Sequence, residues 1–162
     1  MRILAMTRLR LKSYRVLPRF IWVNEQAIAQ LRVSPGFLCG KLLGEPNLTM
    51  WTATLWDSEE SLRAFYLSGD HRRLMPELAG FACEAISGHI VYDSAELPLW
   101  PFIHEQLRRM GRLSAGVTEP NDNHRNRIVV APRFTLLTRP VGPKHPARSG
   151  GENLGSGRVG AV

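Results

Sequence analysis

One histidine of the chain stands in a setting suited to proton transfer. His71 follows Asp70 in the run SGDHRR, at the predicted start of a short helix. Because an imidazole titrates near neutral pH, His71 is the candidate general base of the chain. A histidine at a helix start can instead cap the helix, bond to Asp70 or pair across a dimer, and these structural roles are the more common ones.

The other side chains that could take part in chemistry are weaker candidates than His71. Arg72 and Arg73 could hold a carboxylate or a phenolate in bidentate fashion, although solvated arginines are more common. His89, in a predicted strand, is the second candidate base, and such a histidine is more often a satisfied structural group. Cys39 and Cys83 are widely separated, and the sequence contains neither CxxC nor HxxxH, so we predict reduced thiols and no metal site.

The elements that would position His71 follow one another between Met50 and Met75. A strand comes first, and its side chains alternate between two faces: Trp51, Ala53 and Leu55 on one, and Met50, Thr52, Thr54 and Trp56 on the other. Both faces carry bulky groups, so we expect cover on both sides of the sheet. A helix capped by Asp57 then leads through Ser68-Gly69 into the short helix of His71.

Over the whole chain the pattern gives the order strand, helix, strand, strand, helix, strand. The predicted elements are strands at 3–11, 36–44, 50–56 and 81–92, a helix at about 18–32, and a broken helix ending near residue 80. This order is the βαββαβ unit of the ferredoxin-like fold, in the α+β class. It predicts an antiparallel four-stranded sheet with both helices on one face.

The second face of such a sheet would be bare in a monomer, and a homodimer through that face is the simplest cover. A further helix is predicted at 97–113, with the apolar stripe Leu99, Phe102, Ile103, Leu107 and Met110. We therefore divide the chain into a domain at 1–113 and a basic, Gly/Pro-rich and mostly disordered tail at 114–162, with one stray strand around 128–138.

The net charge of +7 comes mainly from that tail. Residues 121–162 contain seven lysines and arginines against two acidic residues, whereas residues 1–120 contain fourteen against twelve. The folded part is therefore nearly neutral, and we predict no nucleic-acid partner. No apolar run reaches the roughly 18 residues of a membrane span, and the apolar start is too short for a signal peptide, which predicts a cytoplasmic protein.

In a fold of this kind a pocket lies between the sheet and the helices, where aromatic rings can stack on a flat ligand. The residues predicted to line it and bind a small hydrophobic ligand, beside His71, are Trp22, Asn24, Phe37, Trp51, Thr52, Trp56, Phe65, Arg72, Met75 and His89. For any one of the aromatic residues, the plainer alternative is that it fills the core.

Four segments carry a resemblance to a known family. They are SPGFLCGKLL (34–43), WTATLWDSEESLRAF (51–65), SGDHRRLMPELAG (68–80) and, more loosely, TRLRLKS (7–13). In these segments the chain resembles the dimeric α+β barrel superfamily that includes the antibiotic biosynthesis monooxygenases, and particularly small proteins described as similar to spheroidene monooxygenase. The resemblance covers about residues 5–113.

This resemblance implies a monooxygenase-like protein that oxidises or binds an aromatic or polyene hydrophobe. In the cofactor-free oxygenases of the superfamily, an activated phenol or anthrone loses a proton in an apolar pocket and passes an electron to dioxygen. The resemblance therefore implies that no cofactor is needed, and His71 is our candidate for the base that removes the proton. Haem is the alternative, with His71 as the iron ligand.

The haem-degrading branch relies on an Asn, a Trp and a His in fixed places. Here Phe65 and Pro76 stand where the Trp and the His are expected, which argues against haem breakdown by that mechanism. Two other function classes stay open. One is a non-catalytic module for small hydrophobes or stress response, because the superfamily includes members without known activity. The other is an interaction protein whose basic tail reaches an acidic partner.

Overall fold

A six-stranded antiparallel sheet forms the centre of the protein, whose computed structural model describes residues 1–144. The first part of the chain contains β1 (Arg2–Leu11), α1 (Leu17–Val33), β2 (Phe37–Gly44), β3 (Thr49–Trp56), α2 (Glu59–Tyr66), α3 (Gly69–Phe81) and β4 (Ala82–Tyr92). The second part contains α4 (Trp100–Met110), β5 (Arg112–Leu113), α5 (Asp122–Arg125) and β6 (Thr138–Val141), with 3-10 turns at Tyr14–Val16 and Thr135–Leu137. Within residues 1–144, no helix is long and apolar enough to cross a membrane.

The α+β class and the βαββαβ order are as the sequence predicts. The strands of this unit pair in the order β4-β1-β3-β2, and α2 and α3 are the two parts of the predicted broken helix. The prediction of four strands was wrong, because the sheet order is β5-β4-β1-β3-β2-β6. The two additional strands come from the chain beyond the unit and extend both edges of the sheet.

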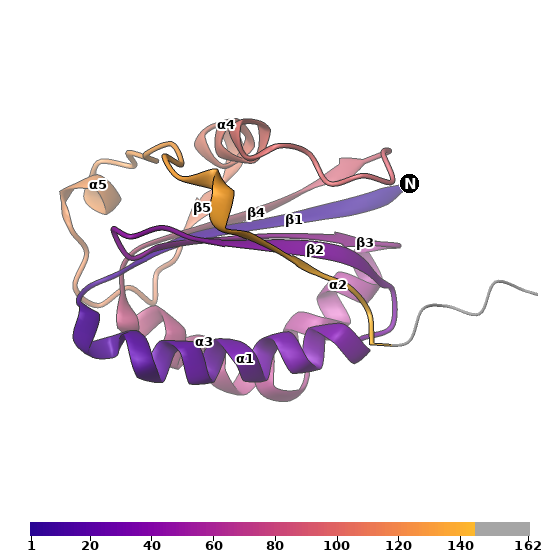
Figure 1. Ribbon diagram of the computed structural model, residues 1–162, viewed down its shortest axis with the longest axis horizontal. Coiled ribbons are helices and arrows are strands. Elements are labelled where there is room, and N and C mark those ends of the chain that lie inside the picture. The colour runs from indigo at the N-terminus through magenta and orange to yellow at the C-terminus, as the bar shows by residue number, and fades with distance from the viewer. Residues whose placement is uncertain (145–162) are drawn as a thin grey trace, which may run out of the picture.

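The helices α1, α2 and α3 form one layer on one face of the sheet (Figure 1). Two groups of buried apolar side chains join this layer to the strands. The first group is Ile3, Ala5, Ile28, Leu31, Phe37, Trp56, Leu62, Phe65 and Val141, and the second is Leu11, Phe20, Val23, Leu48, Leu74 and Leu78. The alternation predicted for β3 is confirmed, because Trp56 faces this layer whereas Trp51 belongs to the opposite face.

The opposite face of the sheet is covered by α4 and by the segment that follows it, as Figure 1 shows. The buried cluster on this face consists of Leu4, Met6, Leu43, Trp51, Ala53, Leu55 and Ile86 from the strands, with Trp100, Ile103, Leu107 and Val129 from the cover. The predicted apolar stripe of this helix was right at Ile103 and Leu107. It was wrong at Leu99, which is 78% exposed, and at Phe102 and Met110, which are both 39% exposed. The face that we expected to be bare is thus covered within one chain, and it supplies no reason for a dimer.

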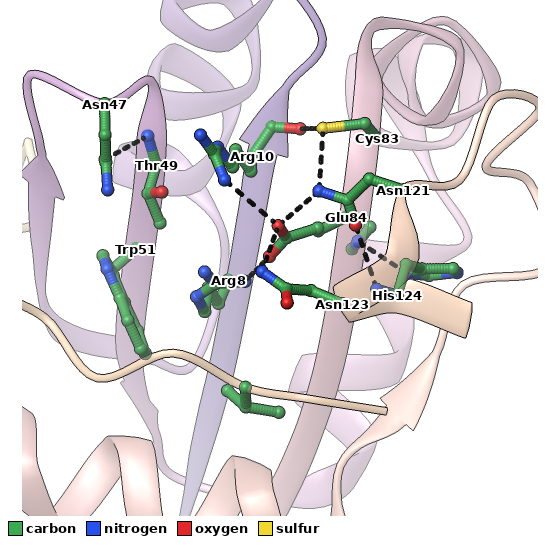
Figure 2. A network of polar contacts seen from close by, with 12 residues as sticks. Arg8, Arg10, Asn47, Thr49, Trp51, Cys83, Glu84, Asn121, Asn123 and His124 are labelled. Atoms are coloured by element: carbon green, nitrogen blue, oxygen red, sulfur yellow. Dashed lines mark hydrogen bonds and ion pairs between the residues drawn. The ribbon is translucent and has the colours of Figure 1, made fainter. Parts of the chain in front are cut away.

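Buried carboxylates fasten the covering segment to the sheet. Glu84 binds Arg8 at 2.5 Å and accepts hydrogen bonds from Asn121 at 2.6 Å and from Asn123 at 3.2 Å (Figure 2). Burial alone would raise the pKa of Glu84, but these hydrogen bonds and the Arg8 charge outweigh burial and lower the pKa. Glu84 is therefore ionised and fully engaged.

A second carboxylate acts in the same way at the other side of this face. Glu45 is 5% exposed, accepts a hydrogen bond from the Trp51 indole at 2.8 Å and accepts another from the Arg133 backbone amide at 2.7 Å. In addition, the Trp100 indole donates to Thr138 at 2.8 Å. These bonds satisfy polar groups that burial would otherwise leave unpaired.

The expectation of a mostly disordered tail therefore does not hold for residues 114–144. Val129 and Val141 are 9% and 6% exposed, and β6 pairs with β2. Sequence composition misled the prediction because this segment has few apolar residues, and the ones that it buries pack against a face already built by the strands. The remainder of the predicted tail, residues 145–162, lies outside the described residues.

We predict that this cover contributes directly to stability. Val129→Asp places a carboxylate against the apolar cluster and should lower the free energy of unfolding by at least about 2 kcal/mol. The neighbouring Ile128 is 52% exposed, so Ile128→Asp should change it by less than about 1 kcal/mol. Urea denaturation measures both values, and equal effects of the two variants would show that the segment is not packed as described.

Candidate functional site

A cleft of about 1000 Å³ lies between the sheet and the helix layer. Its roof is formed by α1 and α3 with the end of α2, and its floor by the strands β3, β1 and β4. The inner part is mainly apolar, with Ala5, Ala27, Ile28, Leu31, Leu42, Phe65 and Leu78 in its lining. A hollow of this size, apolar with a few polar groups, is the usual form of a small-molecule site.

Strand register places three hydroxyl groups on the floor of this cleft. Thr7 is paired directly with Thr52, and Ala5 with Thr54, so all four side chains share the face toward the helices. The Thr54 hydroxyl accepts a hydrogen bond from the Trp56 indole at 3.0 Å, which commits it to the core. Thr7 and Thr52 are only partly buried and line the cleft, where they can meet a ligand oxygen.

The position of His71 is set by the break between α2 and α3. Gly69 has a φ of +56°, and a Cβ atom there would lie 2.9 Å from the side chain of Gln30. Gln30 in turn accepts a hydrogen bond from the His71 backbone amide at 2.6 Å. The imidazole then packs with its centroid 4.5 Å from the Phe65 ring and 5.0 Å from the Tyr66 ring.

This enclosure changes the chemistry of His71. Burial lowers its pKa to about 4, with the backbone of Tyr66 acting in the opposite direction, and its Nδ1 atom is buried without a hydrogen-bond partner. Burial likewise raises the pKa of Tyr66 to about 12. Both groups are therefore neutral at pH 7, and the surrounding protein covers the Nδ1 atom of the imidazole.

At its open end the cleft has a second histidine. His89 of β4 has a side chain 48% exposed, with its Nε2 atom 3.7 Å from a carboxylate oxygen of Glu59 at the start of α2. Ser87, two residues earlier on the same face of β4, is also exposed. The pair therefore stands at the mouth of the cleft rather than inside it.

The structure brings six of the eleven predicted site residues together in the cleft lining: Asn24, Thr52, Phe65, His71, Met75 and His89. Phe37 and Trp56 lie in the core beside it, with ring centroids 5.6 Å apart, and are not among its lining residues. Whether the six bind a ligand stays a prediction.

The other three predicted residues lie elsewhere. Trp51 is on the opposite face of the sheet, where it packs against Trp100. Trp22 is 48% exposed on the outside of α1, with the Arg19 guanidinium 4.4 Å above its ring. Arg72 is exposed and does not line the cleft. Helical phase thus turns Trp22 away from the site although Asn24, two residues later, lines it.

Sequence reasoning missed several lining residues. Thr7 of β1 is one of them, and its direct pairing with Thr52 places it on the same face. Tyr66, at the end of α2, is another. Arg112 and Ser114 lie in the segment after α4, and no pattern indicated that this segment returns to the sheet.

The residues present do not fit a haem ligated by the Nδ1 atom of His71. This atom is enclosed by protein, so it is not presented to an iron. Within residues 1–144 no group of three or more His, Cys, Asp or Glu side chains is placed to hold a metal ion. Cys39 and Cys83 are free, and burial raises the pKa of both thiols.

A second, smaller hollow of about 420 Å³ lies at the end of β1, beside the turn between β2 and β3. Its lining is largely polar and includes Arg10, Lys12 and Cys83. Both cations already face carboxylates, Arg10 at 3.5 Å from Glu84 and Lys12 at 2.6 Å from Glu119. We therefore regard this hollow as part of the network that holds the covering segment.

Comparison with known proteins supports the fold. No family model matches the chain, and no curated protein does. Among solved structures, a point mutant of SnoaB, a cofactor-independent oxygenase from Streptomyces nogalater, is similar with a TM-score of 0.51 at 16% identity, over 60% of this chain and 98% of that one.

Two further structures agree with this result. Rv0793 from Mycobacterium tuberculosis has a TM-score of 0.54 at 10% identity, over 59% of this chain and 100% of that one. A putative antibiotic biosynthesis monooxygenase from Bacteroides thetaiotaomicron has a TM-score of 0.52 at 10% identity, over 60% of this chain and 95% of that one. The predicted resemblance to the antibiotic biosynthesis monooxygenases is thus confirmed at the level of the fold, whereas the likeness to spheroidene monooxygenase is not specifically supported.

The low pKa of His71 predicts a dependence of stability on pH. The unfolded chain binds a proton at this residue near pH 6.5, but the folded protein does so only near pH 4, so stability is lost as the pH falls between these values. Between pH 7 and pH 5, protonation of His71 in the unfolded chain lowers the free energy of unfolding by about 2 kcal/mol. His71→Leu should abolish that part of the loss, and urea denaturation at both pH values measures it.

The matched control is His89→Leu, because His89 is half exposed at the mouth of the cleft. This variant should keep the pH dependence of the wild type. The same loss between pH 7 and pH 5 in His71→Leu would show that this imidazole is not held in its neutral form by burial.

Proposed function

We propose that this protein binds an aromatic or polyene hydrophobe in the cleft between the sheet and the helices, and oxidises it with dioxygen without a bound cofactor. The observation that carries the proposal is the cleft itself, with an apolar inner part, threonine hydroxyls on its floor and a neutral imidazole in its wall. A flat hydrophobe gains from burial against the apolar lining, and its oxygen can bond to Thr7 or Thr52. The similar fold of a cofactor-independent oxygenase supports the chemistry.

In this proposal the substrate itself supplies the electrons. An anthrone loses a proton from its central methylene, the resulting carbanion reduces dioxygen, and the carbon becomes a carbonyl while the second oxygen atom leaves as water. His71 is the proposed proton acceptor, because the low pKa keeps its ring unprotonated throughout the neutral range. A rotation of the ring would be needed to turn the buried Nδ1 atom toward a ligand. His89, beside Glu59, is the second candidate.

One observation favours a second function, that of a module which binds a small hydrophobe without changing it. The Nδ1 atom of His71 is covered by protein, and the ring packs against Phe65 and Tyr66 as core histidines do. In this alternative the cleft is a binding site, and His71 shapes its wall.

Other features of the proposal rest on the sequence. The cytoplasmic location and the homodimer stay predictions. Because α4 and residues 114–144 cover the second face of the sheet, a dimer would have to use another surface. The alternative in which a basic tail reaches an acidic partner stays a prediction. Five of the seven lysines and arginines of residues 121–162 lie within the described residues, where Arg125 and Arg139 pair with Asp122 and Glu25.

We predict that filling the cleft abolishes ligand binding. Ala27 of α1 lines the cleft, so Ala27→Trp should weaken the binding of anthrone at least tenfold by occupying the space of its rings. Ala29 is exposed on the same helix, and Ala29→Trp should bind anthrone as the wild type does. Fluorescence or calorimetric titration measures both. Unchanged binding in Ala27→Trp would place the ligand elsewhere.

Oxygen uptake separates the enzyme from the binding module. With anthrone as substrate, the wild type should accelerate uptake, and His71→Ala should slow it about a hundredfold or more because the base is lost. The wild-type rate should persist from pH 8 to about pH 5 and fall as the pH approaches 4, where His71 takes up a proton. Binding without uptake, across a panel of anthrones and catechols, would establish the binding module instead.

A further inference from the structure

The floor of the cleft continues beyond the helix layer to the edge of the sheet. Ser87 of β4 is paired directly with Arg112 of β5, and both residues line the cavity. Directly paired residues of antiparallel strands project from the same face, so the Arg112 side chain stands beside Ser87 on the floor at the open end.

The position of Arg112 is fixed by close packing of its neighbours. A Cβ atom at Gly111 would lie 2.5 Å from the Leu107 carbonyl and 2.8 Å from Ile86, so only glycine allows this approach. The Gly111 carbonyl accepts a hydrogen bond from Arg127 at 2.6 Å, and the Ser114 amide donates to the Ala85 carbonyl at 2.9 Å. The backbone on both sides of Arg112 is thus held to β4.

The charges of the lining are unevenly placed. Arg112 is its one lysine or arginine, and Glu59 is its one carboxylate, which lies 3.7 Å from His89. Among residues 1–144, no carboxylate lies within ion-pair distance of Arg112, and its guanidinium makes no hydrogen bond to them. Within the part of the chain that the structure describes, the cleft therefore joins an apolar interior to a cation without an ion-pair partner at its mouth.

Sheet geometry gives the spacing between these two parts. Neighbouring strands lie about 4.8 Å apart, and three such intervals separate β3 from β5, which puts Arg112 roughly 14 Å across the floor from the β3 residue Thr52. A ligand that spans this distance has room for an aromatic or polyene body inside and a short arm that reaches the mouth.

We propose that the ligand of this cleft is an amphipathic hydrophobe with a terminal carboxylate, and that Arg112, assisted by the Ser87 hydroxyl, binds this carboxylate. A guanidinium offers two parallel N–H donors that match the two carboxylate oxygens, which fixes the orientation of the ligand as well as its affinity. The inference rests on the binding part of the proposed function and names its ligand class. Arg112 thereby becomes a specificity residue supplied by the chain beyond the βαββαβ unit.

The experiment compares two probes that differ only in the acid group, 1-pyrenebutanoic acid and 1-pyrenebutanol. By fluorescence titration at low salt, the wild type should bind the acid about five- to tenfold more tightly than the alcohol. Arg112→Gln should remove this preference by weakening the acid alone, and Arg112→Lys should keep part of it. Salt at about 0.5 M should reduce the preference in the wild type because the ion pair is exposed.

The matched control is Arg109→Gln, since Arg109 is an exposed arginine in the last turn of α4 that does not line the cleft. It should leave both affinities unchanged. Binding of the alcohol with no preference for the acid, or a preference that survives in Arg112→Gln, would overturn the assignment of Arg112 while the hydrophobe site stands. Failure of the wild type to bind either probe would overturn the hydrophobe site and this inference together.

Discussion

The structure depends on covering both faces of one sheet within a single chain. In β3, Trp56 and Trp51 project in opposite directions, and both are almost fully buried. Burial of a large apolar side chain contributes about 1.5–3 kcal/mol, so leaving the second face open would cost several such contributions. The chain solves this with α4 and residues 114–144, and the helices α1–α3 are then free to frame a cleft on the first face.

Polar groups determine where the cover lies, because a few apolar side chains alone would fit a flat sheet face in many ways. Glu84 and Glu45 each accept hydrogen bonds from the strands and from the cover. Loss of the hydrogen bonds to either carboxylate would leave a buried polar group without partners. This loss costs more free energy than the net amount that the same hydrogen bonds contribute to stability. Such carboxylates therefore specify one arrangement of the segment more than they add stability. The same arrangement holds β5 against β4 and brings Arg112 to the cleft.

The sequence predicts features that depend on neighbouring residues better than features that depend on residues far apart in the chain. The order of the elements up to Tyr92 and the alternation of β3 are local patterns, and both were read correctly. The covering segment depends on partners far away in the chain, such as Arg133 on Glu45, and its composition resembles that of a disordered tail. In the site, Thr52 lies on the cleft face of β3, whereas Trp22 was assigned to the cleft as an aromatic residue and helical phase turns it outward.

The cleft combines two environments that favour different tasks. Near the interior, burial keeps His71 neutral and would also strengthen any electrostatic interaction with a ligand, since little water reaches this end. At the mouth, Arg112 and the pair of His89 with Glu59 are solvated, so charged groups there can be bound without a large desolvation cost. A ligand with an apolar body and an acid end would satisfy both environments at once, because its carboxylate stays in water while its rings leave water. The reverse orientation would bury an unpaired carboxylate beside Phe65. The free-energy cost of that burial favours a single orientation of the ligand in the cleft.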